Sequence, residues 1–271
     1  MTLTAPDLNV VQAAWTKFMG YRVVGRGRLS HPTASGWGAP AAAGKPYLIL
    51  GPESGETTYL RFVEQGERGN DTGAGTLGWT TTEITVQNTD QLYERLKDSP
   101  FTVTRPPAAI PTYSYLRAMH AVGPAGEQLN LTWITQPRAD LAVAKSFVGR
   151  CFITVLGAPD LAAALQFYHT TFGNVPSPIR QLPALQLAVV PLSDGAKIEV
   201  DRYGPEARAR ALPAGGLPPG IALVTFDCSR FDQLHDRFIT RPARNAIEPL
   251  RGSRTATLRG AAGELVELLE S

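Results

Sequence analysis

Residues 152–173 (FITVLGAPDLAAALQFYHTTFG) combine an apolar, β-rich run with a helix-forming segment, joined by Ala-Pro-Asp. Asp160 suits the start of that helix, because its carboxylate can accept hydrogen bonds from the free backbone amides of the first turn. Gly173 suits the helix end, where the backbone often adopts a left-handed conformation. The stretch therefore predicts a strand that leads directly into a helix.

The same pattern occurs near the start of the chain. Each half carries an Asp-Leu pair, an aromatic residue and a glycine at equal spacing: Asp7-Leu8, Trp15 and Gly20, then Asp160-Leu161, Tyr168 and Gly173. The halves also end alike, because residues 117–131 align without a gap with residues 254–268. Internal similarity of this kind is typical of a duplicated architecture. We expect one domain at residues 1–136, a linker at 137–148 and a second domain at 149–271.

Composition narrows the class of protein. The chain has 271 residues, of which 43% are hydrophobic, and a formal net charge of +2, as in an ordinary globular protein. That charge is too small to indicate a nucleic-acid partner. No stretch is apolar enough to cross a membrane and residues 1–6 do not resemble a signal peptide, so we expect a cytoplasmic protein with no membrane partner. Cys151 and Cys228 lie in apolar runs and are expected to be core residues, not a disulfide.

Each half divides again into two units of one strand, one helix and further strands. In the first half we expect helices at 12–20 and 89–96, and strands at 47–50, 58–63, 81–86, 115–122 and 129–134. In the second half we expect helices at 160–173 and 230–238, and strands at 150–156, 185–191, 196–203, 221–226, 254–258 and 265–269. The glycine-rich stretches 25–44 and 66–78 are expected to be exposed connections or pocket lids.

This arrangement resembles the vicinal oxygen chelate superfamily, which includes glyoxalase I, extradiol dioxygenases, fosfomycin-resistance enzymes and bleomycin-binding proteins. The resemblance rests on a βαβββ unit used four times, with D-L-x6-Y-x4-G after its first strand and G-x3-[EN]-L in its last, and covers nearly the whole chain. It implies an α+β fold of tandem glyoxalase/bleomycin-resistance/dioxygenase domains. Each domain would combine two βαβββ modules into a cupped, mostly antiparallel sheet. Activity does not follow, because this scaffold hosts many chemistries.

The resemblance also implies positions for a metal. In metal-dependent members, four inward positions, usually His, Gln or Glu, hold a divalent cation. In the second half they fall on Ile153, Glu199, Leu223 and Glu267. In the first half the first position would precede Met1, and the other three fall on Arg61, Glu83 and Asn130. Aliphatic groups cannot coordinate, and the Arg61 cation would repel a metal. We therefore predict that the protein uses no metal and no other cofactor.

Polar side chains should share one inner wall of the first half, because side chains alternate along a strand. They are Tyr59, Arg61, Thr81, Glu83, Thr85, Gln128, Asn130 and Thr132. One interpretation is an internal Arg61–Glu83 ion pair, satisfied by Asn130 and Gln128. The other is a site in which Glu83 acts as a general base while Arg61 or Asn130 holds a carbonyl or carboxylate of the ligand. A neighbouring Arg would lower the pKa of Glu83, which counts against the catalytic interpretation.

In the second half, Lys197, Glu199 and Asp201 alternate on one strand, with Glu267 expected across the cup. Two nearby carboxyl groups would raise one pKa, as acid–base catalysis requires, unless Lys197 forms a salt bridge with a Glu at the rim. His120 could face the first cup, with Tyr113 and Tyr115 near its mouth, or be a hydrogen-bonded strand histidine.

We predict a metal-independent lyase or isomerase that moves a proton next to a carbonyl of a small apolar or aromatic oxygenated molecule. The candidate catalytic residues are Glu83, Glu267 and His120. The candidate ligand-binding residues are Tyr59, Arg61, Tyr115, Gln128, Asn130 and Glu199. The protein is expected to be a monomer or homodimer. One alternative is a non-catalytic protein that sequesters an antibiotic or metabolite. A second is a metal-dependent enzyme like glyoxalase or an extradiol dioxygenase, with His120 and the Glu residues as ligands.

Overall fold

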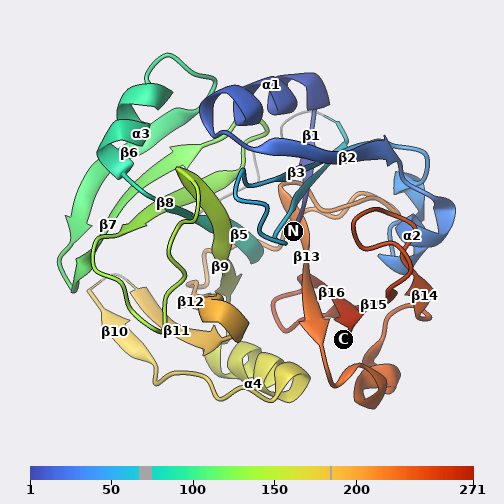
Figure 1. The fold of residues 1–271 in the computed structure, drawn as a ribbon. Coiled ribbons are helices and arrows are strands. Elements are labelled where there is room, and N and C mark those ends of the chain that lie inside the picture. The colour runs from blue at the N-terminus through green and yellow to red at the C-terminus, as the bar shows by residue number, and fades with distance from the viewer. Residues whose placement is uncertain (67–74, 184) are drawn as a thin grey trace.

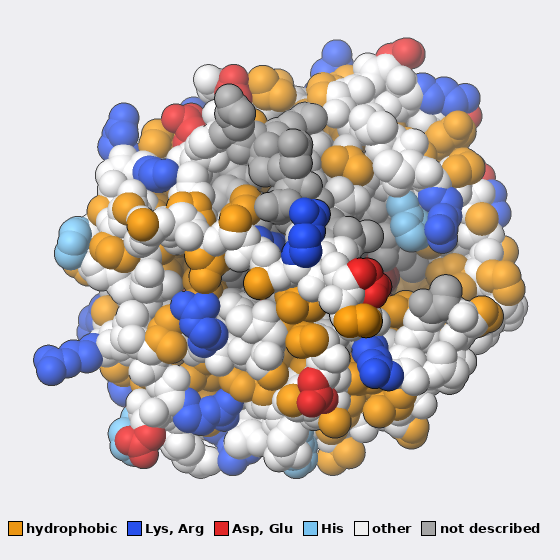
Figure 2. All heavy atoms as spheres, turned by 180° about the vertical axis from the view of Figure 1, so that it is seen from behind, with side chains coloured by type: hydrophobic (Ala, Val, Ile, Leu, Met, Phe, Trp, Pro, Cys, Tyr) orange, Lys and Arg blue, Asp and Glu red, His pale blue; other side chains and the backbone are white. Residues whose placement is uncertain are grey.

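A computed structural model describes residues 1–66, 75–183 and 185–271 of the chain. The described strands form two sheets of eight strands each, with helices α1, α3 and α4 at the periphery of the molecule (Figure 1). None of the helices in these ranges is long and apolar enough to cross a membrane. On the face shown in Figure 2, described side chains of both charges are scattered among apolar ones.

The strands and helices follow a βαβββ order four times. The first module contains β1 (Thr2–Ala5), α1 (Leu8–Phe18), β2 (Arg22–Arg28), β3 (Pro46–Gly51) and β4 (Leu60–Glu64). The second contains β5 (Gly78–Val86), α3 (Thr89–Leu96), β6 (Thr102–Ile110), β7 (Tyr113–Val122) and β8 (Gln128–Ile134). The third contains β9 (Val148–Ala158), α4 (Leu161–Phe172), β10 (Arg180–Leu182), β11 (Leu185–Pro191) and β12 (Lys197–Arg202). The fourth contains β13 (Ile221–Cys228), the 3-10 helix η3 (Phe231–Arg237), β14 (Ala243–Arg244), β15 (Arg254–Arg259) and β16 (Leu265–Glu270).

Each sheet combines two modules, which confirms the predicted α+β fold, but the modules do not pair in chain order. The first and fourth modules form sheet I, in the order β14-β15-β16-β13-β1-β4-β3-β2. The second and third form sheet II, in the order β10-β11-β12-β9-β5-β8-β7-β6. Most neighbouring strands are antiparallel, as expected. The expectation that Arg61 and Glu83 share one wall is wrong, because Arg61 lies in sheet I and Glu83 in sheet II.

Local signals in the sequence position the main helices. The carboxylate of Asp7 accepts hydrogen bonds from backbone amides in the first turn of α1, and that of Asp160 does so in α4. Gly173 ends α4 with a φ of 80°. The expected helix at 230–238 is instead η3, where Arg230 offers no side-chain cap. An uncapped segment leaves backbone amides unsatisfied, which disfavours an α-helix.

The duplicated motif forms the same structural contact in both halves. The Trp15 indole of α1 donates a hydrogen bond to Glu127 at 2.9 Å, and the Tyr168 hydroxyl of α4 donates to Glu264 at 2.6 Å. Each carboxylate also accepts from a backbone amide two residues earlier, so it closes the loop before the last strand. A Cβ at Gly123 would lie 2.0 Å from the Glu127 carboxylate, which explains the glycine there. These carboxylates therefore join helix to sheet.

The glycine-rich stretch 25–44 is not an exposed connection. Part of it extends β2, and the rest forms α2 (His31–Gly36) and the 3-10 helix η1 (Pro40–Ala42). Trp37 at the end of α2 is 1% exposed and packs in one apolar cluster with sheet I residues that include Ile49 and Leu223. This segment therefore fills the inside of sheet I. The second stretch, 66–78, lies mostly outside the described residues.

Candidate active site

Sheet II brings together carboxyl groups from two modules. Glu83 on β5 lies between Asn130 on β8 and Ile153 on β9, and Glu199 on β12 lies next to Val155 of β9. Because neighbours across a sheet point to the same face, Glu83 and Glu199 share one face. Asp201 lies two residues further along β12 and points the same way.

The three carboxyl groups perturb one another. Burial raises the pKa of Glu83 to about 8, and the charge of Glu199 acts in the same direction. Burial and then Asp201 raise the pKa of Glu199 to about 8, while burial and then Glu83 raise the pKa of Asp201 to about 7. Asp201 is 8% exposed, and its Oδ1 has no hydrogen-bond partner among the residues that the structure describes. Such a cluster retains protons near neutral pH, which is a property of acid–base sites.

Two neutral side chains contact Glu83 directly. The Asn130 amide donates to Oε1 at 3.3 Å, and the Thr132 hydroxyl donates to Oε2 at 3.4 Å. These hydrogen bonds lower the pKa of Glu83, but burial outweighs them. The expected Arg61–Glu83 ion pair does not form, so the argument against Glu83 as a base no longer holds. Asn130 remains beside Glu83, as the sequence predicted.

The linker covers one edge of this face. Lys197 forms its ion pair with Asp140 of the linker at 3.5 Å, so the expected pair with a Glu on its own sheet is wrong. Leu141 and Ala142 follow Asp140 and pack in an apolar cluster that includes Ile153. The polar cluster thus lies beside an apolar wall.

Aromatic and cationic side chains lie at the ends of the sheet. The guanidinium of Arg138 lies over the Tyr115 ring at 4.5 Å, and that of Arg180 over the Tyr113 ring at 5.4 Å. Arg180 is on β10 and Tyr113 on β7, which are far apart in strand order, so sheet II must curl to bring them together. Arg180 also lowers the pKa of Glu199, which places it near the carboxyl cluster. We call Tyr113, Tyr115, Arg138 and Arg180 the mouth of sheet II.

Two further predicted residues lie on the strands beside Glu83. His120 on β7 pairs with Asn130 and is half-buried. Burial and then the charge of Arg105 lower the pKa of His120, so its ring is neutral at neutral pH. Gln128 precedes Asn130 by two residues, and its amide donates to the Gly126 carbonyl at 3.4 Å. His120 therefore borders the cluster, while the Gln128 amide bonds to its own loop.

Glu267, expected across the cup from Glu199, lies in sheet I instead. Trp37 and Thr225 each donate a hydrogen bond to its carboxylate at 2.7 Å, and Arg61 lies 4.0 Å away. Glu267 is 1% exposed, and the α2 segment fills the space in front of it. Its oxygens are thus engaged in internal contacts, which indicates a structural role. Tyr59 also belongs to this part of the molecule, at the start of β4.

The observed pairing of modules regroups the positions where the resemblance places a metal. In sheet II they are Glu83, Asn130, Ile153 and Glu199; in sheet I they include Arg61, Leu223 and Glu267. Within the described ranges, no three His, Cys, Asp or Glu side chains are arranged to hold a metal ion. Ile153 offers no donor at one of the four positions, and the carboxyl groups of the cluster contact one another instead. The donor set does not fit a metal, and no step below is assigned to one.

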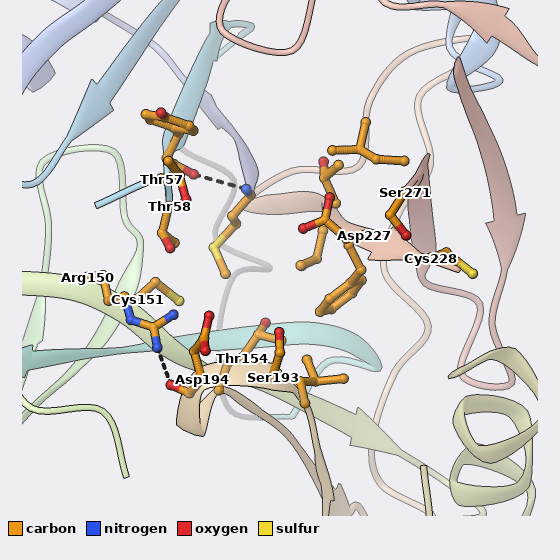
Figure 3. A pocket seen from close by; sticks show the side chains of 18 of the residues that line it. Thr57, Thr58, Arg150, Cys151, Thr154, Ser193, Asp194, Asp227, Cys228 and Ser271 are labelled. Carbon is orange, nitrogen blue, oxygen red and sulfur yellow. Dashed lines mark hydrogen bonds between the residues drawn. The ribbon is translucent and has the colours of Figure 1, made fainter. Parts of the chain in front are cut away.

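A large cavity lies between the sheets, away from the carboxyl cluster. Its volume is about 770 Å³, and its lining includes Arg61 and Thr225 of sheet I. Thr154 of sheet II also lines it (Figure 3). Thr154 points to the face of sheet II opposite to that of its neighbour Ile153, and therefore away from Glu83. Sequence analysis did not predict this cavity, because its walls come from three modules. No local pattern signals that they meet.

Comparison with known proteins supports the fold and does not assign an activity. The sequence matches no protein-family model and no curated protein. Glyoxalase I from Zea mays superposes with a TM-score of 0.67 at 17% identity, over 99% of this chain and 90% of that one. A putative dioxygenase from Bacillus subtilis superposes with a TM-score of 0.69 at 12% identity, over 100% of this chain and 83% of that one. At these identities the likeness is one of fold alone.

Proposed function

Starting from the two-domain fold of the vicinal oxygen chelate superfamily that this chain has, we propose a lyase or isomerase that transfers a proton next to a carbonyl. The observation that carries the proposal is the cluster of Glu83, Glu199 and Asp201 on one face of sheet II, each with a raised pKa. Carboxyl groups tuned towards neutral pH can both accept and donate protons there. Because the fold permits many activities, the reaction type is inferred from the residues of the site.

Glu83 is the proposed base. Its raised pKa makes its carboxylate a stronger base than an ordinary glutamate, and Asn130 and Thr132 hold it by hydrogen bonds. The base takes a proton from the carbon beside the carbonyl, and the C–H bonding pair moves into an enolate. The Asn130 amide, which already lies 3.3 Å from Glu83, would donate to the enolate oxygen.

A second carboxyl group completes the transfer. Glu199 is protonated near neutral pH by virtue of its raised pKa, so it can return a proton to the neighbouring carbon or to a departing group. Return to carbon gives an isomerase, and loss of the leaving group gives a lyase. In both cases the cluster gives up one proton and gains one, so it needs no further reagent.

The mouth of sheet II favours a substrate with a carboxylate and an aromatic or apolar body. Arg138 and Arg180 supply positive charge there, and the rings of Tyr115 and Tyr113 supply flat apolar surface. Arginine suits planar recognition of a carboxylate, and stacking on an aromatic ring keeps its guanidinium oriented. His120, neutral beside Asn130, provides a hydrogen-bonding group without a charge.

Exchange of carbon-bound hydrogen in D2O tests the proposal without knowledge of the full reaction. A panel of aromatic and aliphatic 2-oxo acids and hydroxyketones is incubated with the protein, and loss of the proton signal beside the carbonyl is followed by NMR. We expect Glu83→Gln to slow exchange by about 10²- to 10⁴-fold, the usual contribution of a general base. Affinity, measured by saturation-transfer NMR, should change little. The exposed Glu94→Gln on α3 is the matched control.

The same experiment separates catalysis from sequestration. If compounds of the panel bind at the cup but none exchanges faster than in buffer, the chain is a binding protein and the catalytic proposal fails. If exchange persists in Glu83→Gln, a different group is the base. Exchange that is abolished by chelators and restored by a divalent cation would favour a metalloenzyme.

A further inference from the structure

The cavity between the sheets contains an arginine whose hydrogen-bonding capacity is not met. Arg61 is 5% exposed and lines this cavity of about 770 Å³. Its Nη1 donates to the Thr2 hydroxyl at 3.1 Å, and its nearest carboxylate, on Glu267, lies 4.0 Å away. Its Nε has no hydrogen-bond partner within the described part of the chain. A guanidinium has five N–H donors, and burying one without a partner costs free energy.

Other cations of the cavity wall already have partners. Arg150 forms an ion pair with Glu56 at 3.4 Å and also donates to the Asp194 carbonyl. Lys197 pairs with Asp140 of the linker. Glu267 lies 4.0 Å from Arg61, beyond hydrogen-bond distance, and its two oxygens accept from Trp37 and Thr225. A carboxylate that entered this cavity would give the Arg61 guanidinium a closer negative partner than Glu267 at 4.0 Å.

The rest of the wall indicates the body of such a ligand. Phe172, Val224, Phe226, Leu192 and Leu250 give it apolar surface. Thr57 and Thr58 lie across the opening from Asp227 and Ser271 (Figure 3). Apolar walls with a few convergent polar groups are typical of small-molecule sites, and a volume of this size accommodates a small organic molecule. The acidic side chains of Asp194 and Asp227 disfavour a second negative charge.

We propose that this cavity is a separate binding site for a small organic monocarboxylate with an aromatic or aliphatic body, anchored by Arg61. The site does not depend on the proposed reaction. Thr154 of β9 lines it and points away from the face of sheet II that carries Ile153 and Glu83, and Lys197 reaches it from the edge of that face. The carboxylate would accept from the guanidinium as a planar, charge-assisted pair.

The test uses benzoate and 3-phenylpropionate, with benzamide and 3-phenylpropionamide as uncharged counterparts. Titration of isotope-labelled protein followed by amide NMR should shift signals of residues 150–154 and 224–228, and the amides should bind about tenfold more weakly or not at all. Arg61→Met should weaken carboxylate binding about 10- to 100-fold, since it removes a charge-assisted hydrogen bond. Signals of residues 83 and 130 report the carboxyl cluster, so the two sites are read separately.

A second variant keeps the test decisive if Arg61→Met does not fold. Thr58→Trp leaves Arg61 in place and fills the opening of the cavity, so it should abolish the shifts of residues 224–228. Equal affinity for acids and amides, or shifts confined to the carboxyl cluster, would overturn the proposal. So would unchanged binding in Thr58→Trp. Failure here leaves the D2O exchange experiment unaffected, because that experiment reports Glu83.

Discussion

Replacing Glu83 by glutamine is expected to change how folding stability depends on pH. Burial raises the pKa of Glu83 from 4.5 to about 8. Between these values the folded protein holds a proton that the unfolded chain has lost. Because the native state then binds more protons than the unfolded state, the free energy of unfolding falls as pH rises through this window. Glu199 and Asp201 are shifted in the same direction, so they add to the fall.

The size of the effect follows from the number of protons. One retained proton lowers the free energy of unfolding by about 1.4 kcal/mol per pH unit. From about pH 5.5 to about pH 7.5, Glu83 alone therefore contributes a loss of about 2 to 3 kcal/mol, an upper value because its side chain is partly accessible. Glu83→Gln keeps the volume and removes the ionisable group. It also removes a charge that raises the pKa of Asp201.

Urea denaturation across this pH range measures both slopes. We expect the free energy of unfolding to fall more steeply with pH in the wild-type protein than in Glu83→Gln. The difference in slope should be about 1.4 kcal/mol per pH unit, the effect of one proton. The exposed Glu94→Gln should follow the wild-type profile. Parallel profiles for wild type and Glu83→Gln would mean that Glu83 is ionised in the folded protein at neutral pH. The argument from the raised pKa of Glu83 would then fail.

Three further predictions concern the contacts that support the site. Trp37→Phe removes the 2.7 Å donor to buried Glu267 and should lower the free energy of unfolding by about 1 to 3 kcal/mol in urea denaturation. Glu264→Gln disturbs the contact of α4 with sheet I through Tyr168 and should also lower the urea midpoint of unfolding. The rate of substrate hydrogen exchange in D2O, which reports Glu83, should stay at the wild-type level. Fragments 1–136 and 149–271 should each give poor circular dichroism signals alone and regain them on mixing, because both sheets need a module from each.

Signals that act over a few residues were enough to predict most elements. The helix at 89–96 and the strand at 185–191 have the predicted bounds in the structure. Asp160 and Gly173 mark the ends of α4 as expected, because capping depends only on residues within one turn. The duplicated pattern identified the four modules for the same reason. Such features do not depend on which module pairs with which.

The pairing of modules could not be predicted, because both arrangements satisfy the same local patterns. Strand alternation says that Arg61 and Glu83 both point inwards, and it is silent on whether they point into the same sheet. The structure separates them, so the ion pair that would have lowered the pKa of Glu83 is absent. Instead of a cation, Glu83 has Glu199 from the other half of the chain as its neighbour. Burial and the charge of Glu199 therefore raise the pKa of Glu83, where Arg61 would have lowered it. A long-range contact thus decides the chemistry.

The sequence also did not predict that residues 25–44 pack against the inner face of sheet I. Stretch 25–44 is rich in glycine, which is typical of exposed connections. One residue in it carries the opposite signal: Trp37 is a large apolar side chain in a segment otherwise made of small residues. Its indole packs inside sheet I, and its N–H donates to Glu267. A tryptophan within a connection is reason to test that connection as part of the core.

Comparison of equivalent residues in the two halves separates structural carboxylates from those of the proposed site. Glu127 and Glu264 are equivalent, and both join a helix to a sheet, so the duplicated carboxylate is structural. Asn130 and Glu267 are also equivalent in sequence, yet Asn130 borders a partly accessible carboxyl cluster while Glu267 is enclosed by donors. In sheet I, the space in front of Glu267 is therefore taken by the protein's own side chains. The carboxyl groups of sheet II are buried at a cost that the nearby Lys197 and Arg180 offset only in part, because their pKa values stay raised. Such an arrangement is typical of functional sites, which is why we propose the reaction at this sheet.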